Sequence, residues 1–233
     1  MKYNSDNIQF QWHSTGQLIL TFQAPMEMVN ELNTLFDELT TLNKLPKINE
    51  TLVGKIDNEY SLYLNHTEPD GTPSKDNHNF MPPDILKWLE DRIHQYLQFN
   101  FIEHRGTKTH SIWINDYKQG EYNPIHKHEG DYIFKSPLQD RGLQEGLIGM
   151  LSLKMPDMGP EFVSNAVPTN GQVVFISNAS GQFSNRLYKP KCEAGTFLVF
   201  PYDMLHTVYP HFNQTETRRT MPINIDVYVR SNM

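Results

Sequence analysis

The sequence of 233 residues predicts a mainly β protein in which two helices precede, and pack against, a C-terminal jelly roll. In its second half, short runs rich in Val, Ile and Phe are bounded by Gly, Pro and Asn, with no helical pattern between them. In its first half, apolar residues recur twice at helical spacing. Aromatic residues make up 12% of the chain, which favours a β-rich core.

The N-terminal part is expected to contain two short strands, at 8–15 and 18–25, followed by two helices. The first helix should run from Pro25 to about Thr41. The second should follow Pro82-Pro83 with Asp84 as its cap. Apolar residues expected on the buried faces of the two helices are Met28, Leu32, Leu35, Leu39, Leu42, Ile85, Leu86, Leu89, Ile93, Tyr96 and Leu97. The polar segment 65–79 between the helices is punctuated by Pro and Gly and predicts a surface loop.

Five later runs are typical of strands: SIWINDY, GLIGMLSLKMP, GQVVFIS, GTFLVFP and TMPINIDVYV. They predict that residues 105–233 form the β core. Residues 1–104 should supply the N-terminal strands and helices that pack on it. Both parts are expected to share one core, as a single continuous domain.

The composition narrows the possible partners. A formal net charge of -7 and a pI near 5.8 offer no broad basic surface, so nucleic acid is not expected as a partner. No stretch approaches the roughly 18 apolar residues of a membrane span. The N-terminal MKYNSDNIQF lacks the apolar run of a secretory signal, and the lone Cys192 fits a reducing compartment. We therefore expect a cytoplasmic protein that acts on a small molecule or a peptide, while its oligomeric state stays open.

Three histidines are placed where strands are expected to end. His126 and His128 lie in GEYNPIHKHEGD, and residues two apart in an extended segment project to the same side. His206 comes about 80 residues later, after the run GTFLVFPYDML. Facing strands at the mouth of a barrel could bring three such imidazoles to one metal ion.

A second pattern lies twelve residues beyond His206, in the run Thr217-Arg218-Arg219-Thr220. In a strand, Arg218, Thr220, Pro222 and Asn224 share one face, and Met221, Ile223 and Ile225 share the other. The apolar face should pack into the core, which points Arg218 toward a ligand. A guanidinium matches a carboxylate in a bidentate way, and Thr220 could donate a further bond. Arg219 is expected on the opposite face, or at its edge, as a solvated charge.

Together these residues resemble the iron(II)/2-oxoglutarate-dependent oxygenases, and within them a branch found in phage and marine bacterial genomes. The resemblance covers about residues 110–226 and is carried, in order, by Trp113, Asn115, Gly120, Asn123, His126, His128, Gly149, Phe200, Pro201, Leu205, His206, Val208, Pro210, Arg218, Thr220 and Asn224. It implies a double-stranded β-helix, the cupin-like jelly roll, with Fe(II) at its open end. It also implies hydroxylation of an unidentified substrate by molecular oxygen, with succinate and CO2 as co-products.

The resemblance assigns roles to individual residues. His126, His128 and His206 would be the metal ligands at the catalytic centre. Arg218 would bind the 5-carboxylate of 2-oxoglutarate, assisted by Thr220. Asn115 would contact the cofactor or the substrate, and Tyr117 and Tyr132 are alternatives for that role.

Two sets of alternatives remain open at this point. Most of the wider superfamily has Asp or Glu at the position of His128, so Glu129 or Asp131 could complete the metal site instead. The following segment 131–146 is either a loop that closes over the substrate or an ordinary connection. The competing functions are a three-histidine cupin-like metalloenzyme that does not use 2-oxoglutarate, and a non-catalytic β-sandwich protein with a binding or structural role.

Overall fold

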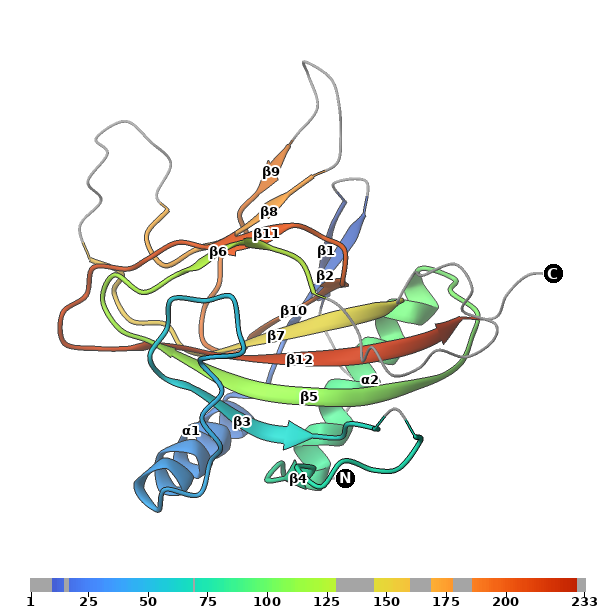
Figure 1. The fold of residues 1–233 in the computed structure, drawn as a ribbon. Coiled ribbons are helices and arrows are strands. Elements are labelled where there is room, and N and C mark those ends of the chain that lie inside the picture. Colours follow the sequence, from blue (N-terminus) through green and yellow to red (C-terminus); the bar gives the residue numbers. More distant parts are fainter. Residues whose placement is uncertain are drawn as a thin grey trace.

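The computed structural model describes residues 10–14, 17–68, 70–128, 145–159, 169–177 and 186–229. These residues form two antiparallel sheets and two helices (Figure 1). In that part of the chain, no helix is long and apolar enough to cross a membrane.

The larger sheet has eight strands, and it combines strands from the beginning and the end of the chain. Its order is β1 (Phe10–Ser14), β2 (Leu18–Gln23), β10 (Thr196–Pro201), β7 (Gly146–Lys154), β12 (Arg218–Val229), β5 (His104–Tyr117), β3 (Glu59–Leu64) and β4 (His78–Asn79). The long strands β5, β12 and β7 lie at its centre, side by side (Figure 1).

The smaller sheet has four short strands in the order β6 (Asn123–His126), β11 (His206–Val208), β8 (Val173–Ile176) and β9 (Leu187–Tyr188). It faces the large sheet across an apolar layer that includes Ile148, Met150, Phe175 and Phe200. His206 on β11 is directly paired with His126 on β6. The antiparallel register therefore brings together two of the three candidate ligands.

Two helices cover the other face of the large sheet, α1 (Met26–Thr41) and α2 (Pro83–Phe99) (Figure 1). The apolar sides of the helices pack on alternate residues of the central strands, among them Leu151, Met221 and Ile223. This helical layer buries one face of the large sheet. The opposite face of the sheet is left to form a site.

The helix predictions are confirmed in position and corrected in detail. α1 buries Phe36 fully, while Leu42 follows the last helical residue as its C-cap and is 61% exposed. The residue before α2 is Pro82, which makes no side-chain cap, and Asp84 lies in the first turn. A carboxylate in the first turn still interacts favourably with the helix dipole. The cap assignment was wrong because the proline pair begins the helix with its fixed backbone angle.

All of the predicted strand runs form strands, but several strands were missed. β4, β6, β9 and β11 have between two and four residues, too few for a periodic signal, and the six-residue strand β3 was also missed. The expected loop at 65–79 ends in β4, and His78 turns back to Ser61, with 2.8 Å between Nε2 and Oγ. The missed strand β3 matters most, because it lies on the site described below.

Arg219 is not a solvated charge, as the sequence suggested, but a buried one. It lies on the helix side of β12 with 3% of its surface exposed. Its Nε donates to Asp116 at 3.0 Å, its Nη1 to Asn33 at 3.0 Å, and its Nη2 approaches Asp37 at 2.8 Å. The guanidinium also stacks 4.3 Å from the Phe36 ring centre. Arg219 therefore links the sheet to α1 through partners that no local pattern reveals.

Replacing Arg219 with methionine should lower the free energy of unfolding by about 2 to 4 kcal/mol, because the buried Asp116 carboxylate would lose its paired cation. Urea unfolding measures this change. The matched control is Lys154→Ala, which removes the exposed 3.5 Å pair with Asp37 and should cost less than about 1 kcal/mol. Equal effects of the two substitutions would mean that the Arg219 network contributes no more than a surface ion pair.

Candidate functional site

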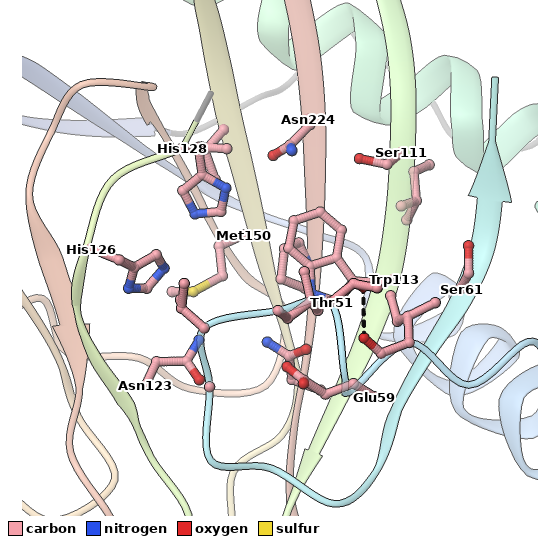
Figure 2. Close-up of a pocket in the computed structure, with 18 of the residues that line it drawn as sticks. Thr51, Glu59, Ser61, Ser111, Trp113, Asn123, His126, His128, Met150 and Asn224 are labelled. Carbon is pink, nitrogen blue, oxygen red and sulfur yellow. Dashed lines mark hydrogen bonds between the residues drawn. The ribbon is translucent and has the colours of Figure 1, made fainter. Parts of the chain in front are cut away.

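A pocket of about 880 Å³ opens between the two sheets (Figure 2). β6 and β11 supply one wall, β3 and β5 another, and β7, β10 and β12 contribute residues as well. Apolar side chains such as Trp113, Met150 and Phe200 line much of it. Polar groups converge on this apolar space, which is the usual composition of a ligand pocket.

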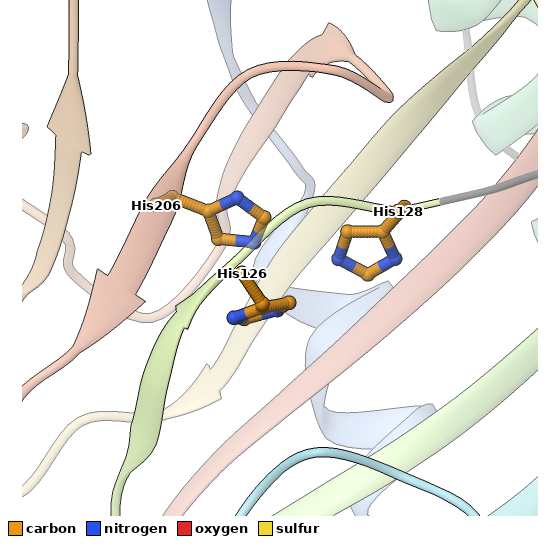
Figure 3. Close-up of side chains that lie close together, drawn as sticks. All are labelled: His126, His128 and His206. Carbon is orange, nitrogen blue, oxygen red and sulfur yellow. The ribbon is translucent and has the colours of Figure 1, made fainter.

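Three imidazoles meet at one side of the pocket, those of His126, His128 and His206 (Figure 3). One ring nitrogen of each lies within 4.8 Å of the others. The ring centres of His126 and His206 are 4.2 Å apart, and that of His128 is 5.1 and 5.2 Å from them. Histidine binds metals at about 2.0 to 2.1 Å, so nitrogens this close could share one ion.

Backbone hydrogen bonds orient two of the rings. Nδ1 of His126 lies 2.8 Å from the Pro124 carbonyl, and Nδ1 of His206 lies 2.9 Å from the Met204 carbonyl. A carbonyl only accepts, so the proton of each ring is on Nδ1 and the lone pair of Nε2 is available to a metal. The backbone N–H of His128 donates to the Tyr202 carbonyl at 2.9 Å, which holds the third residue in place.

The environment keeps these imidazoles neutral. Burial, followed by the neighbouring His126, lowers the pKa of His206 to about 3. Burial also lowers the pKa of His126, and burial together with the two other imidazoles brings the pKa of His128 well below its ordinary value. Neutral imidazole is the form that binds metals, so the cluster is ready to act as a ligand set at neutral pH.

Arg218 lies on the pocket side of β12, on the face that the strand pattern predicted. It is fully buried, with its guanidinium carbon 4.8 Å from the Tyr117 ring centre. Burial raises the pKa of Tyr117, and the Arg218 charge opposes that rise. Within the described residues, none of the three guanidinium nitrogens makes a well-formed hydrogen bond, although the Tyr117 hydroxyl lies near enough to interact with the Arg218 side chain. A buried, unpaired cation costs several kcal/mol, so this position suits an anionic ligand.

Thr220 and Asn115 add further polar atoms beside Arg218. Thr220 is fully buried on the same face of β12, and its Oγ1 has no partner among the described residues. Asn115 is paired with Thr220 across β5 and β12, and it lines the pocket. Its Nδ2 donates to the Tyr117 hydroxyl at 3.3 Å, while its Oδ1 is similarly unpartnered. Asn115 thus brings an unpartnered oxygen to the pocket lining, and Arg218 and Thr220 hold further unpartnered polar atoms on the neighbouring strand.

The structure thus places His126, His128, His206 and Asn115 in the lining of one pocket, with His128 as part of the histidine cluster, whereas Arg218 and Thr220 are buried in the sheet and are not among the lining residues. The alternative ligands Glu129 and Asp131 lie outside the described residues, as do Tyr132 and most of the 131–146 segment.

Sequence reasoning missed Glu59, which lines the pocket from β3. It is fully buried, and neither carboxylate oxygen has a hydrogen-bond partner in the described part of the chain. Burial, with a smaller effect of Glu121, raises its pKa to about 7. The alternation of Glu59 and Ser61 with Tyr60 and Leu62 was the signal that could have identified this strand, although a register shift after Ser61 ends it.

The raised pKa of Glu59 makes the stability of the protein depend on pH. The folded pKa of about 7 lies above the ordinary value of 4.5, so between these values the folded state holds a proton that the unfolded state loses. Stability should therefore fall by about 2 kcal/mol as pH rises through this window, after allowing for solvent in the pocket. Glu59→Gln should remove that fall, as urea unfolding at pH 5 and pH 8 would show. Parallel pH profiles for both proteins would contradict the assignment.

No protein-family model and no curated protein sequence matches this chain. Solved structures do resemble it. A Pseudomonas putida prolyl-4-hydroxylase has a TM-score of 0.52 at 13% identity, over 91% of this chain and 93% of that one. HygX from Streptomyces hygroscopicus, with nickel and 2-oxoglutarate bound, has 0.53 at 8%, over 89% and 82%. The truncated viral collagen prolyl hydroxylase of Paramecium Bursaria Chlorella virus-1 has 0.51 at 13%, over 96% of each chain.

At identities this low, the likeness concerns the fold. The predicted fold class is confirmed: this chain has a mainly β, double-stranded β-helix architecture of two antiparallel sheets, which it shares with these structures, with two helices packed on the larger sheet.

Proposed function

We propose that this protein is an iron(II)/2-oxoglutarate-dependent dioxygenase that hydroxylates a small molecule or a peptide, with succinate and CO2 as co-products. The observation that carries the proposal is Arg218, a fully buried guanidinium with no anionic partner among the described residues, on the sheet that lines the histidine pocket. A bound carboxylate would satisfy it. The fold and the histidine cluster support the same proposed function.

Different residues would bind the metal and the cofactor. His126, His128 and His206 would hold the iron through neutral ring nitrogens. Arg218 would hold the distal carboxylate of 2-oxoglutarate by a bidentate bond, with Thr220 as a further donor. Asn115 would contact the cofactor or the substrate. When bound, iron and 2-oxoglutarate together supply the activation of molecular oxygen that hydroxylation requires.

The chain itself contributes orientation and exclusion of water. The Pro124 and Met204 carbonyls fix the tautomers of two ligands, so that the metal-binding nitrogens point the same way in every molecule. The apolar walls formed by Met150 and Phe200 shield the reacting region from solvent. A three-histidine enzyme that does not use 2-oxoglutarate, or a non-catalytic sandwich protein, would leave the buried Arg218 with no anionic partner among the described residues.

Anaerobic reconstitution with iron(II) and 2-oxoglutarate tests the proposal. We expect a weak visible charge-transfer absorption that requires both components, followed in air by slow formation of succinate without added substrate. Iron without 2-oxoglutarate is the control for non-specific metal binding. No such absorption at millimolar 2-oxoglutarate would overturn the proposal.

A further inference from the structure

The pocket contains a carboxylate that the proposed chemistry does not use. Figure 2 shows Glu59 reaching from β3 into the pocket, toward the side that carries Asn123 and His126. It is fully buried, and both its oxygens lack a donor in the described residues. It does not belong to the histidine cluster that could hold a metal. A buried carboxylate without a hydrogen-bond partner lowers the stability of the fold, and a ligand that donates hydrogen bonds to it would offset this loss.

Two amide oxygens near Glu59 are further acceptors, while the indole Nε1 of Trp113, which also lines the pocket, is a buried donor without a partner in the described residues. Asn115 is the direct cross-strand partner of Glu59, and Asn123 lines the same pocket. Both amide oxygens are buried and unpartnered in the part of the chain that the structure describes. Paired residues on neighbouring strands place their side chains about 5 Å apart, so Glu59 and Asn115 present their acceptors together. This wall therefore suits a ligand group that is rich in hydrogen-bond donors.

The charged residues of the pocket lining also favour a cationic ligand. Among the described lining residues, Lys127 is the only lysine or arginine, and its side chain is exposed, while Asp76 adds a second carboxylate. Arg218 does not line the pocket directly, and it has its own proposed anion. The lining also includes Trp113, Ile48 and Leu52, which could pack along an aliphatic stem. A cation would pair with Glu59 while its stem packs against these apolar side chains.

We propose that Glu59 is the specificity-determining anchor of the substrate, and that the substrate carries a protonated amine or guanidinium group on an aliphatic stem. The inference rests on the proposed function, since it treats the pocket beside the histidines as the place where the substrate reacts. The cationic group pairs with Glu59 and donates to Asn115 and Asn123. The stem then extends toward the histidine side of the pocket.

Binding of n-butylguanidinium and of its neutral isostere n-butylurea tests the anchor. Calorimetric titration of the metal-free protein at pH 8 should show the cation binding at least about tenfold more tightly, because only the cation gains a charge-assisted bond. Glu59→Gln should abolish that preference. The matched control is Glu121→Gln, because Glu121 lies outside the pocket lining and accepts from the backbone nitrogens of Asp57 and Lys118. It should keep the preference.

Equal affinity for the two probes in the wild-type protein, or a preference that survives in Glu59→Gln, would overturn the proposal. Circular dichroism and thermal unfolding establish that each variant is folded before it is titrated. The metal-free titration is independent of iron and 2-oxoglutarate. A failure of the anchor is therefore distinguishable from a failure of the proposed function, which the anaerobic absorption reports.

Discussion

Replacing Arg218 with methionine is expected to weaken 2-oxoglutarate binding at least about 100-fold, since two charge-assisted hydrogen bonds are lost together. The same substitution should stabilise the ligand-free protein by about 1 to 3 kcal/mol, because it replaces a buried, unpaired cation with an apolar side chain of similar length. A residue with only a structural role would not produce this opposite pair of effects. Anaerobic titration measures the first effect and urea unfolding the second.

The neighbouring Arg219 supplies the matched control. It is the same residue type on the same strand, but it faces α1 and is paired with Asp116 and Asp37. Arg219→Met should lower stability and leave the 2-oxoglutarate affinity of the folded protein within a few-fold of wild type. If Arg218→Met bound 2-oxoglutarate normally, or if Arg219→Met lost binding while folded, the assignment of the carboxylate site would be wrong.

Replacing His206 with alanine is expected to abolish stoichiometric iron binding, with an affinity loss of more than about 100-fold, because loss of even an outer-shell partner can cost 10- to 100-fold. His206 is the most deeply buried of the three and is paired with His126 across β6 and β11, so water cannot readily replace it in the same geometry. Metal content after anaerobic loading and gel filtration measures the loss. His78→Ala is the control, since His78 also lines the pocket but lies outside the cluster.

His128 decides between the alternative ligand sets. His128→Ala should lower iron affinity as strongly as His206→Ala if three imidazoles hold the metal. Retention of iron in His128→Ala would instead assign the third position to Glu129 or Asp131, which lie outside the described residues. In either outcome the loss of metal in His206→Ala is the reference for a true ligand.

Much of the fold was accessible from the sequence because its signals are local. The faces of β12 follow from alternation, which places Arg218 and Thr220 on one side and Met221 and Ile223 on the other. α1 and α2 follow from the 3.6-residue period. The short strands were harder to predict, because two to four residues carry no period. Their existence depends on the partner strands that pair with them.

The sequence by itself determined which residue types were available for the site and which of them share a strand face: two histidines two positions apart, a third about 80 residues later, and an arginine on a late strand. Only the tertiary structure determines which side chains each of these residues contacts. Arg219 is paired with Asp116, 103 positions away, and with Asn33, 186 positions away, while Arg218 one residue earlier has no such partner in the part of the chain that the structure describes. The pairing of β3 with β5 likewise buries Glu59 in the pocket wall. Burial and charge pairing depend on contacts between distant segments, and periodicity along one segment carries no information about them.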